Sequence, residues 1–258
     1  WADDNWGNIR RLPTPKERER KAGAGVYYHY DYHGGPRSYQ WINTNPIAKV
    51  WDQMSLAKQY GADEIWIVNV GSFKGLELPM EYFMSLGWDT DQWTNLNINE
   101  FTRLFAEREF GKEYAEEIAE ILAKYTKFNG RRKPESLYPH LYSLTNYNEA
   151  DNYIKEYNDL AARAEVIYNK LPEEKRDAFY EIVLFPTKAS AIVNELYVAA
   201  AKNDLYSQQG RASANAMADR TRELFTIDTT MMGHYNRELN GGKWNGFMDQ
   251  AHLGYVAW

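Results

Sequence analysis

The chain of 258 residues contains no cysteine. This absence excludes disulfide bonds and catalysis by a thiol, but it indicates no cellular compartment. Basic residues are not in excess, since 30 Lys and Arg stand against 36 Asp and Glu and the formal net charge is −6. Without a basic stripe we expect no nucleic-acid partner. No apolar run approaches the roughly 20 residues of a membrane span, so we expect no membrane partner, and no signal peptide is visible.

The chain does have enough apolar material for a core and many aromatic rings. Hydrophobic residues make up 44% of the sequence, which suits one large or two modest domains. The 20 Tyr and 9 Trp fill cores and interfaces in most proteins, and such rings also stack on sugars. The first residue is tryptophan, and residues 3–8 are typical of a loop after a strand that is mostly absent. We therefore expect a piece of a larger protein.

The first third alternates between helix and strand patterns. β-branched and aromatic residues predict a strand over 26–31, and a continuous apolar run predicts a second, buried strand over 64–71. Helices are expected over 15–21, over 46–60 with Asn45 as its cap, and over 76–86. This βα pattern predicts an α/β fold with too few strands to close a barrel.

From about residue 88 the apolar residues recur every three or four positions, which predicts helices only. We expect a bundle of four to six helices, with breaks at Pro186 and at either Gly210 or residues 226–230. The predicted fold class is α/β followed by all-α, with one domain over 1–90 and a helical domain over 91–258.

Titratable side chains crowd the end of the first strand, where His29, Asp31 and His33 precede Gly34-Gly35-Pro36. In α/β barrels the carboxyl ends of the strands carry the active site. Alternate spacing places the three side chains on one face, where they suit a metal site, a hydrogen-bonded structural histidine, or a cluster that contacts a ligand. We favour the ligand-contacting cluster, and the other two interpretations stay open.

Two further polar groups accompany this strand end. Asp3-Asp4-Asn5 is typical of a turn or helix cap, and adjacent carboxylates point in opposite directions in an extended chain. They are therefore not automatically an acid–base pair, which needs carboxyl groups ~5 to 9.5 Å apart. Asn69 lies in the second apolar strand on the face of Ile65 and Ile67. A buried amide needs a partner, and at a strand tip a ligand hydroxyl or a neighbouring loop supplies one.

Three motifs together resemble glycoside hydrolase family 115, the xylan α-1,2-glucuronidases. They are residues 3–10 (Asp-Asp-Asn-Trp-Gly-Asn-Ile-Arg), residues 27–39 around Tyr-His-Tyr-Asp-Tyr-His-Gly-Gly-Pro-Arg, and residues 61–71 (Gly-Ala-Asp-Glu-Ile-Trp-Ile-Val-Asn-Val-Gly). The resemblance implies a large parent protein with a (β/α)8 catalytic barrel followed by a helical bundle. This chain would then hold the last strands of that barrel, incomplete here, and the bundle.

The resemblance also implies the activity and the site. Members remove glucuronic acid or its 4-O-methyl ether from xylan by an inverting mechanism, without a metal or other cofactor. His29 and Tyr32 would hydrogen-bond the sugar near the scissile bond, and Asn5 would hold the uronic acid. We add Asp4 and Asn69 as substrate-binding residues from their positions. The acid and base carboxylates are expected before residue 1, so we expect the isolated chain to be inactive.

The expected partner is glucuronoxylan or an oligosaccharide decorated with glucuronic acid, with the parent protein secreted or periplasmic and a homodimer open to test. Two other functions remain open. A carbohydrate-binding module would show a row of exposed rings along one face. A helical interaction domain would show a large exposed apolar patch on its helices and scattered polar residues.

Overall fold

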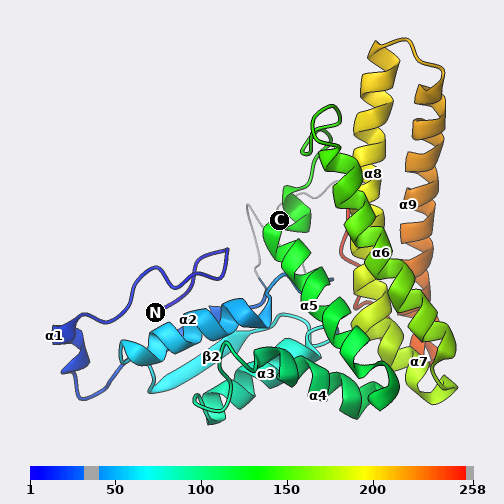
Figure 1. Cartoon of the computed structure of the whole chain (residues 1–258). Coiled ribbons are helices and arrows are strands. Elements are labelled where there is room, and N and C mark those ends of the chain that lie inside the picture. Colours follow the sequence, from blue (N-terminus) through cyan, green and yellow to red (C-terminus); the bar gives the residue numbers. More distant parts are fainter. Residues whose placement is uncertain (32–40, 254–258) are drawn as a thin grey trace. The chain divides into compact units, whose positions relative to one another are not determined.

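The structure is a computed structural model, and it describes residues 1–31 and 41–253. The described chain is mostly helical, with one small parallel sheet (Figure 1). The described residues form two compact units, which divide between Gly130 and Arg131. The boundary falls within the last turn of a helix, and the predicted division into 1–90 and 91–258 stays a prediction.

The first unit contains the sheet. Its elements are α1 (Pro15–Arg18), β1 (Gly25–His29), α2 (Ile47–Gln59), β2 (Ile65–Asn69), α3 (Glu77–Trp88), α4 (Ile98–Phe110) and α5 (Ala115–Arg131). β1 and β2 pair in parallel, with Gly25 opposite Ile65 and His29 opposite Asn69. The predicted order of helices and strands is confirmed, and both strands end earlier than expected because the ladder stops at His29 and Asn69.

The first residues of the chain extend this sheet. The Trp1 amino group donates to Gly25 O over 2.8 Å, and Tyr27 N donates to Trp1 O over 2.7 Å. A parallel bridge joins Ala2 to Tyr27. Residues 1 and 2 therefore lie beside β1 on the edge opposite β2, and residues 3–10 continue from the same end of the sheet as His29.

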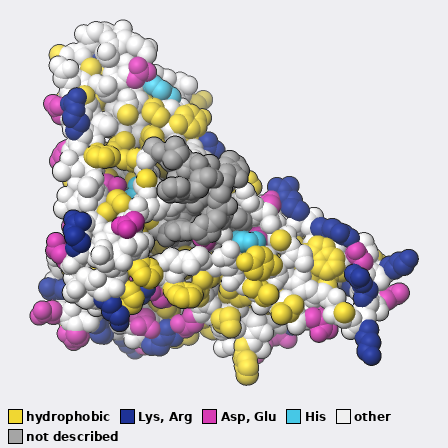
Figure 2. Space-filling model, turned by 180° about the vertical axis from the view of Figure 1, so that it is seen from behind, with side chains coloured by type: hydrophobic (Ala, Val, Ile, Leu, Met, Phe, Trp, Pro, Cys, Tyr) yellow, Lys and Arg dark blue, Asp and Glu magenta, His cyan; other side chains and the backbone are white. Residues whose placement is uncertain are grey.

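The two faces of the sheet differ in burial. Val26 and Tyr28 are buried, and Phe83 of α3 packs on this face with its ring centroid 6.4 Å from that of Tyr28. On the other face Ile65 is 60% exposed and Ile67 47% exposed. The space-filling view shows several groups of exposed hydrophobic side chains between charged and other side chains (Figure 2). The predicted alternation, with Asn69 on the face of Ile65 and Ile67, is confirmed.

The start of α2 differs from the prediction. The helix begins at Ile47, and Pro46 occupies the N-cap position without a side-chain cap bond. Asn45 is buried and donates from Nδ2 to Tyr30 O over 3.2 Å, so its side chain serves the end of β1 and not the helix. Gly61, with φ of +74°, follows the helix as expected.

The second unit consists of helices, with α6 (Glu149–Lys170), α7 (Glu173–Phe179), α8 (Phe185–Gln208) and α9 (Ser213–Arg237). A π-helical turn, Tyr180–Leu184, joins α7 to α8 and precedes Pro186, which has no N–H for an α-helical bond. The predicted interruption is thus a π turn within one long helical segment. By length and hydropathy alone, the segment Glu173–Gln208 could cross a membrane, contrary to our expectation from sequence. Since 83% of its most apolar window is buried, it has the character of a core helix.

The break between α8 and α9 falls at Gly210, with φ of +66°. The alternative break at residues 226–230 is wrong. The hydroxyls of Thr226 and Thr230 donate to the carbonyls of Arg222 and Thr226, so these threonines fit a continuous helix.

Candidate active site

His29 and Asn69 end the two parallel strands side by side. They form the last register pair of the ladder, so both side chains lie on the exposed face of the sheet at its carboxyl end. Asn69 Oδ1 accepts a hydrogen bond from Gly71 N over 3.0 Å, which closes a turn after β2. Its Nδ2 donates to none of the described residues, so this amide presents a donor beside the imidazole.

A buried carboxylate orients His29. Asp3 Oδ1 lies 2.5 Å from His29 Nδ1, and Asp3 Oδ2 accepts from His29 N over 3.3 Å. The Asp3 side chain is fully buried, whereas that of His29 is 18% exposed. A carboxylate accepts only, so it holds a proton on Nδ1 and fixes the orientation of the ring. The Tyr27 ring meets the imidazole edge-on, with centroids 4.6 Å apart.

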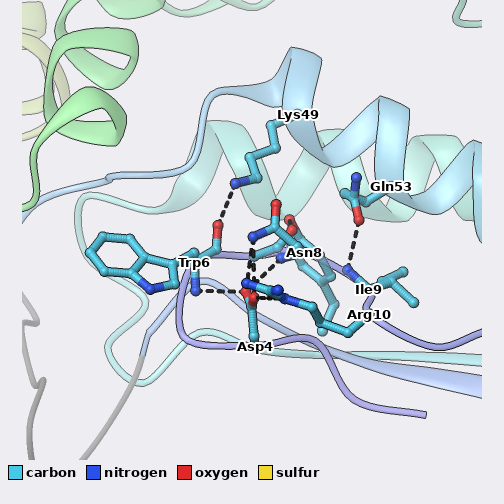
Figure 3. A network of polar contacts seen from close by, with 9 residues as sticks. Asp4, Trp6, Asn8, Ile9, Arg10, Lys49 and Gln53 are labelled. Carbon is cyan, nitrogen blue, oxygen red and sulfur yellow. Dashed lines mark hydrogen bonds and ion pairs between the residues drawn. The ribbon is translucent and has the colours of Figure 1, made fainter.

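Asp4 organises the loop of residues 4–10 (Figure 3). Its Oδ1 accepts from Trp6 N and Asn8 N over 2.9 Å each, and its Oδ2 accepts from Arg10 Nε over 2.5 Å. Burial alone would raise the pKa of this carboxyl, but the hydrogen bonds from Asn8, Arg10 and Trp6 outweigh it and lower the pKa to about 2. Asp4 is therefore ionised at neutral pH and holds the loop together.

Helix α2 and strand β1 fix the same loop in place (Figure 3). Lys49 donates to Trp6 O, and Gln53 Oε1 accepts from Ile9 N over 2.6 Å. The Tyr28 hydroxyl donates to Gly7 O over 2.9 Å. Asn5, exposed between these anchored residues, is thereby held on a rigid loop that starts at Asp3.

The structure brings together most of the predicted site residues within the first unit. His29 and Asn69 meet through the strand register, and Asn5 and Asp4 lie in the loop that Asp3 connects to His29. Tyr32 and His33 lie outside the described residues. Asp31 is buried and packs against Gly71. Within residues 1–31 and 41–253 no group of three or more His, Asp or Glu side chains has the arrangement of a metal site.

Sequence reasoning missed Asp3 as a site residue. It is separated from His29 by 26 positions, and its role depends on the bridge between Ala2 and Tyr27. The feature of the sequence that could have indicated this role is the strand-like start of the chain. If residues 1 and 2 pair with β1, Asp3 lies beside the end of that strand.

Comparison with known proteins places this site in a family. The model of glycosyl hydrolase family 115 matches residues 1–136, which include both strands and the loop of residues 4–10. The chain belongs to glycosyl hydrolase family 115. The resemblance seen in the three sequence motifs is thus confirmed.

A solved structure supports the assignment of this family 115 chain. It is described as a family GH115 4-O-methyl-alpha-glucuronidase with specificity for decorated arabinogalactans. It matches with a TM-score of 0.80 and 27% sequence identity over 96% of this chain. The match covers 33% of that protein, so the chain spans about a third of its length. No curated protein matches the chain.

Proposed function

We propose that this chain is part of an α-glucuronidase that removes glucuronic acid or 4-O-methylglucuronic acid side chains from xylan with inversion. In this proposal β1 and β2 belong to a (β/α)8 barrel, the helices after them form the bundle, and the exposed face of the sheet is the barrel interior. The observation that carries the proposal is the pairing of His29 with Asn69 at the carboxyl ends of adjacent parallel strands, in a chain of this family.

The geometry suits recognition of a sugar. The imidazole of His29 and the donor at Asn69 Nδ2 are complementary to sugar hydroxyls, which both donate and accept. Asn5 and Tyr32 complete the proposed set, with Asn5 on the anchored loop. A site built from groups held by backbone and carboxylate contacts loses little freedom when substrate binds.

The carboxylates of this loop are engaged in other roles. Asp4 is ionised and bound by Arg10, which makes it a poor general acid, and Asp3 accepts from His29. An inverting reaction needs one protonated carboxyl and one ionised carboxylate on opposite sides of the scissile bond. We therefore propose that the acid and the base come from residues other than Asp3 and Asp4. Asp4 then supports the sugar site by holding the loop.

The test is uronic acid release by the full protein that carries this chain. We expect His29→Ala to lower the rate of release from glucuronoxylan at least 100-fold per folded molecule, far more than its loss of stability accounts for. His140→Ala, an exposed histidine paired with Asp204, is the matched control and should leave the rate unchanged. Loss of stability with unchanged activity per folded molecule would make His29 a structural residue and contradict the proposal.

The substrate requires a second arm in the same assay. Because the similar structure is described as specific for decorated arabinogalactans, release from a glucuronic-acid-decorated arabinogalactan is measured beside release from glucuronoxylan. If uronic acid is released from the arabinogalactan alone, the α-glucuronidase assignment stands and the arabinogalactan takes the place of xylan as the proposed substrate.

A further inference from the structure

A cavity of about 600 Å³ lies in the first unit, between α2 and residues 90–94, which follow α3. Its volume is within the range of about 300–1,000 Å³ that is usual for small-molecule sites. Trp51, Lys58 and Asp63 are among the residues that line it.

The cavity is remote from the candidate active site. Asp63 precedes β2, whereas Asn69 ends this strand opposite His29. Six residues of extended chain span about 20 Å, so the cavity lies toward the amino end of the strand and the candidate active site at its carboxyl end. A monosaccharide cannot reach both places, but a polysaccharide can.

Two indole rings line the cavity, and hydrogen bonds hold both of them. Trp51 Nε1 donates to Trp93 O over 2.9 Å, and Trp93 Nε1 donates to Ser85 Oγ over 2.8 Å. Trp93 is buried and Trp51 is half-buried. An indole ring offers apolar surface to the carbon face of a sugar, and a ring that is already fixed loses little freedom when a ligand binds.

Polar side chains at the rim of the cavity are available to a ligand. Gln59 and Asp63 line it, are exposed, and form no side-chain hydrogen bond or ion pair with any described residue. Ser55 adds a hydroxyl to the same lining. A hydroxyl, an amide and a carboxylate together donate and accept, as recognition of sugar hydroxyls requires.

The charges at the cavity favour a neutral ligand. One lysine, Lys58, and two aspartates, Asp63 and Asp91, line it, so the described lining has one positive and two negative charges. Lys58 is already engaged, because its Nζ donates to Thr90 Oγ1 and, over 3.3 Å, to Asp91 Oδ1. A uronate would meet the carboxylate of Asp63 without a compensating cation, which disfavours it.

We propose that this cavity binds neutral backbone sugars of the polysaccharide substrate, at a site separate from the one that holds the uronic acid to be cleaved. The proposal rests on the proposed function, which supplies a polymer with uncharged sugars in its backbone. Fixed indole rings with hydroxyl, amide and carboxylate groups beside them suit a pyranose. The excess of carboxylates disfavours the charged side chains of the same polymer.

Calorimetric titration of the full protein with xylohexaose, a neutral hexamer of xylose, tests the site. We expect Trp51→Ala and Gln59→Ala each to weaken one binding event by about three- to tenfold, and His29→Ala to leave that event unchanged. Gln59 is exposed, so its replacement leaves folding intact even if that of Trp51 does not. Gln92→Ala is the matched control and should leave the event unchanged, because Gln92 is exposed between two lining residues but does not line the cavity.

The remaining arms separate the alternatives. D-Glucuronate should not produce this event, and a Gln59-dependent event as strong as that with xylohexaose would overturn recognition of a neutral sugar. A neutral galacto-oligosaccharide that binds in place of xylohexaose would support the site and assign it to an arabinogalactan backbone. If neither oligosaccharide produces an event that Gln59→Ala weakens while uronic acid is still released, the second site is rejected and the proposed function stands. If the event is present and no uronic acid is released, the proposed function is rejected and the site stands.

Discussion

The contact between Asp3 and His29 can be tested by a substitution that changes a single group of the Asp3 side chain. Asp3→Asn keeps the shape of the side chain but removes its charge and replaces one of the two carboxylate oxygens by an NH2 group. We expect the imidazole to lose its fixed Nδ1–H tautomer, and kcat for uronic acid release by the full protein to fall about 10- to 100-fold.

The comparison with stability separates positioning from structure. Since the buried pair is close-packed, Asp3→Ala should also destabilise, whereas Asp3→Asn should change the melting temperature little and KM less than kcat. An unchanged kcat in Asp3→Asn would show that the orientation of His29 does not depend on this carboxylate.

Asp4 makes a prediction about pH. Its pKa in the folded protein is about 2, below the usual value of 3.8, so its ionised form stabilises the folded state. That stabilisation is fully present above about pH 4 to 5 and is lost as the pH falls through the folded pKa. We expect Asp4→Asn to lower the free energy of unfolding by about 1–2 kcal/mol at pH 7. The difference from the unsubstituted protein should shrink steadily below pH 4 in urea titrations. A difference that stays constant from pH 7 to pH 3 would contradict this account.

At the scale of elements, the turn after β2 depends on Gly71. Its φ is +60°, and an added Cβ would lie 2.6 Å from Cγ of the buried Asp31. Gly71→Ala should therefore combine backbone strain with a clash and lower the free energy of unfolding by about 2–4 kcal/mol. Gly75→Ala is the matched control, because Gly75 has φ of +81° and nothing within 4 Å of an added Cβ. We expect it to cost only about 1 kcal/mol. Equal losses in denaturant titrations would show that the Asp31 contact is unimportant.

Elements were predictable where local pattern decides them. The alternation of helix and strand in the first third and the helix-only pattern afterwards follow from apolar periodicity, so their order was confirmed. The cap of α2 was wrong because a tertiary contact with the end of β1 occupies Asn45. The alternative break at residues 226–230 was wrong because threonine hydroxyls bond back to the helix.

The candidate site was only partly predictable, because contacts between distant parts of the chain decide part of it. The alternation of side chains along each strand places His29 and Asn69 on definite faces, but their pairing requires the register between two strands that are 40 positions apart in sequence. Asp3 was missed because its role comes from a bridge between the chain start and β1. Long-range contacts of this kind leave no periodic signal in one sequence.

At the scale of the whole molecule, the proposed barrel makes a prediction about the exposed face of the sheet. In a closed barrel this face is covered, whereas in a two-stranded sheet it faces solvent. Ile67 is 47% exposed among the described residues, on the same face as His29 and Asn69. If the rest of the full protein closes a barrel over this face, the side chain of Ile67 is buried. If this face is open to solvent instead, an isoleucine in the middle of β2 should tolerate a polar replacement.

Ile67→Asp in the full protein tests this directly. Burial of an unpaired carboxylate in a closed barrel should lower the free energy of unfolding by about 3–5 kcal/mol, or prevent folding, and abolish uronic acid release with it. Leu96→Asp is the matched control, since Leu96 is 91% exposed and a change there should stay within about 0.5 kcal/mol. Urea titration followed by tryptophan fluorescence measures both variants. If Ile67→Asp is as mild as Leu96→Asp, the face faces solvent in the full protein. The side chains of His29 and Asn69 would then lie on an open surface, with no barrel wall to enclose a sugar.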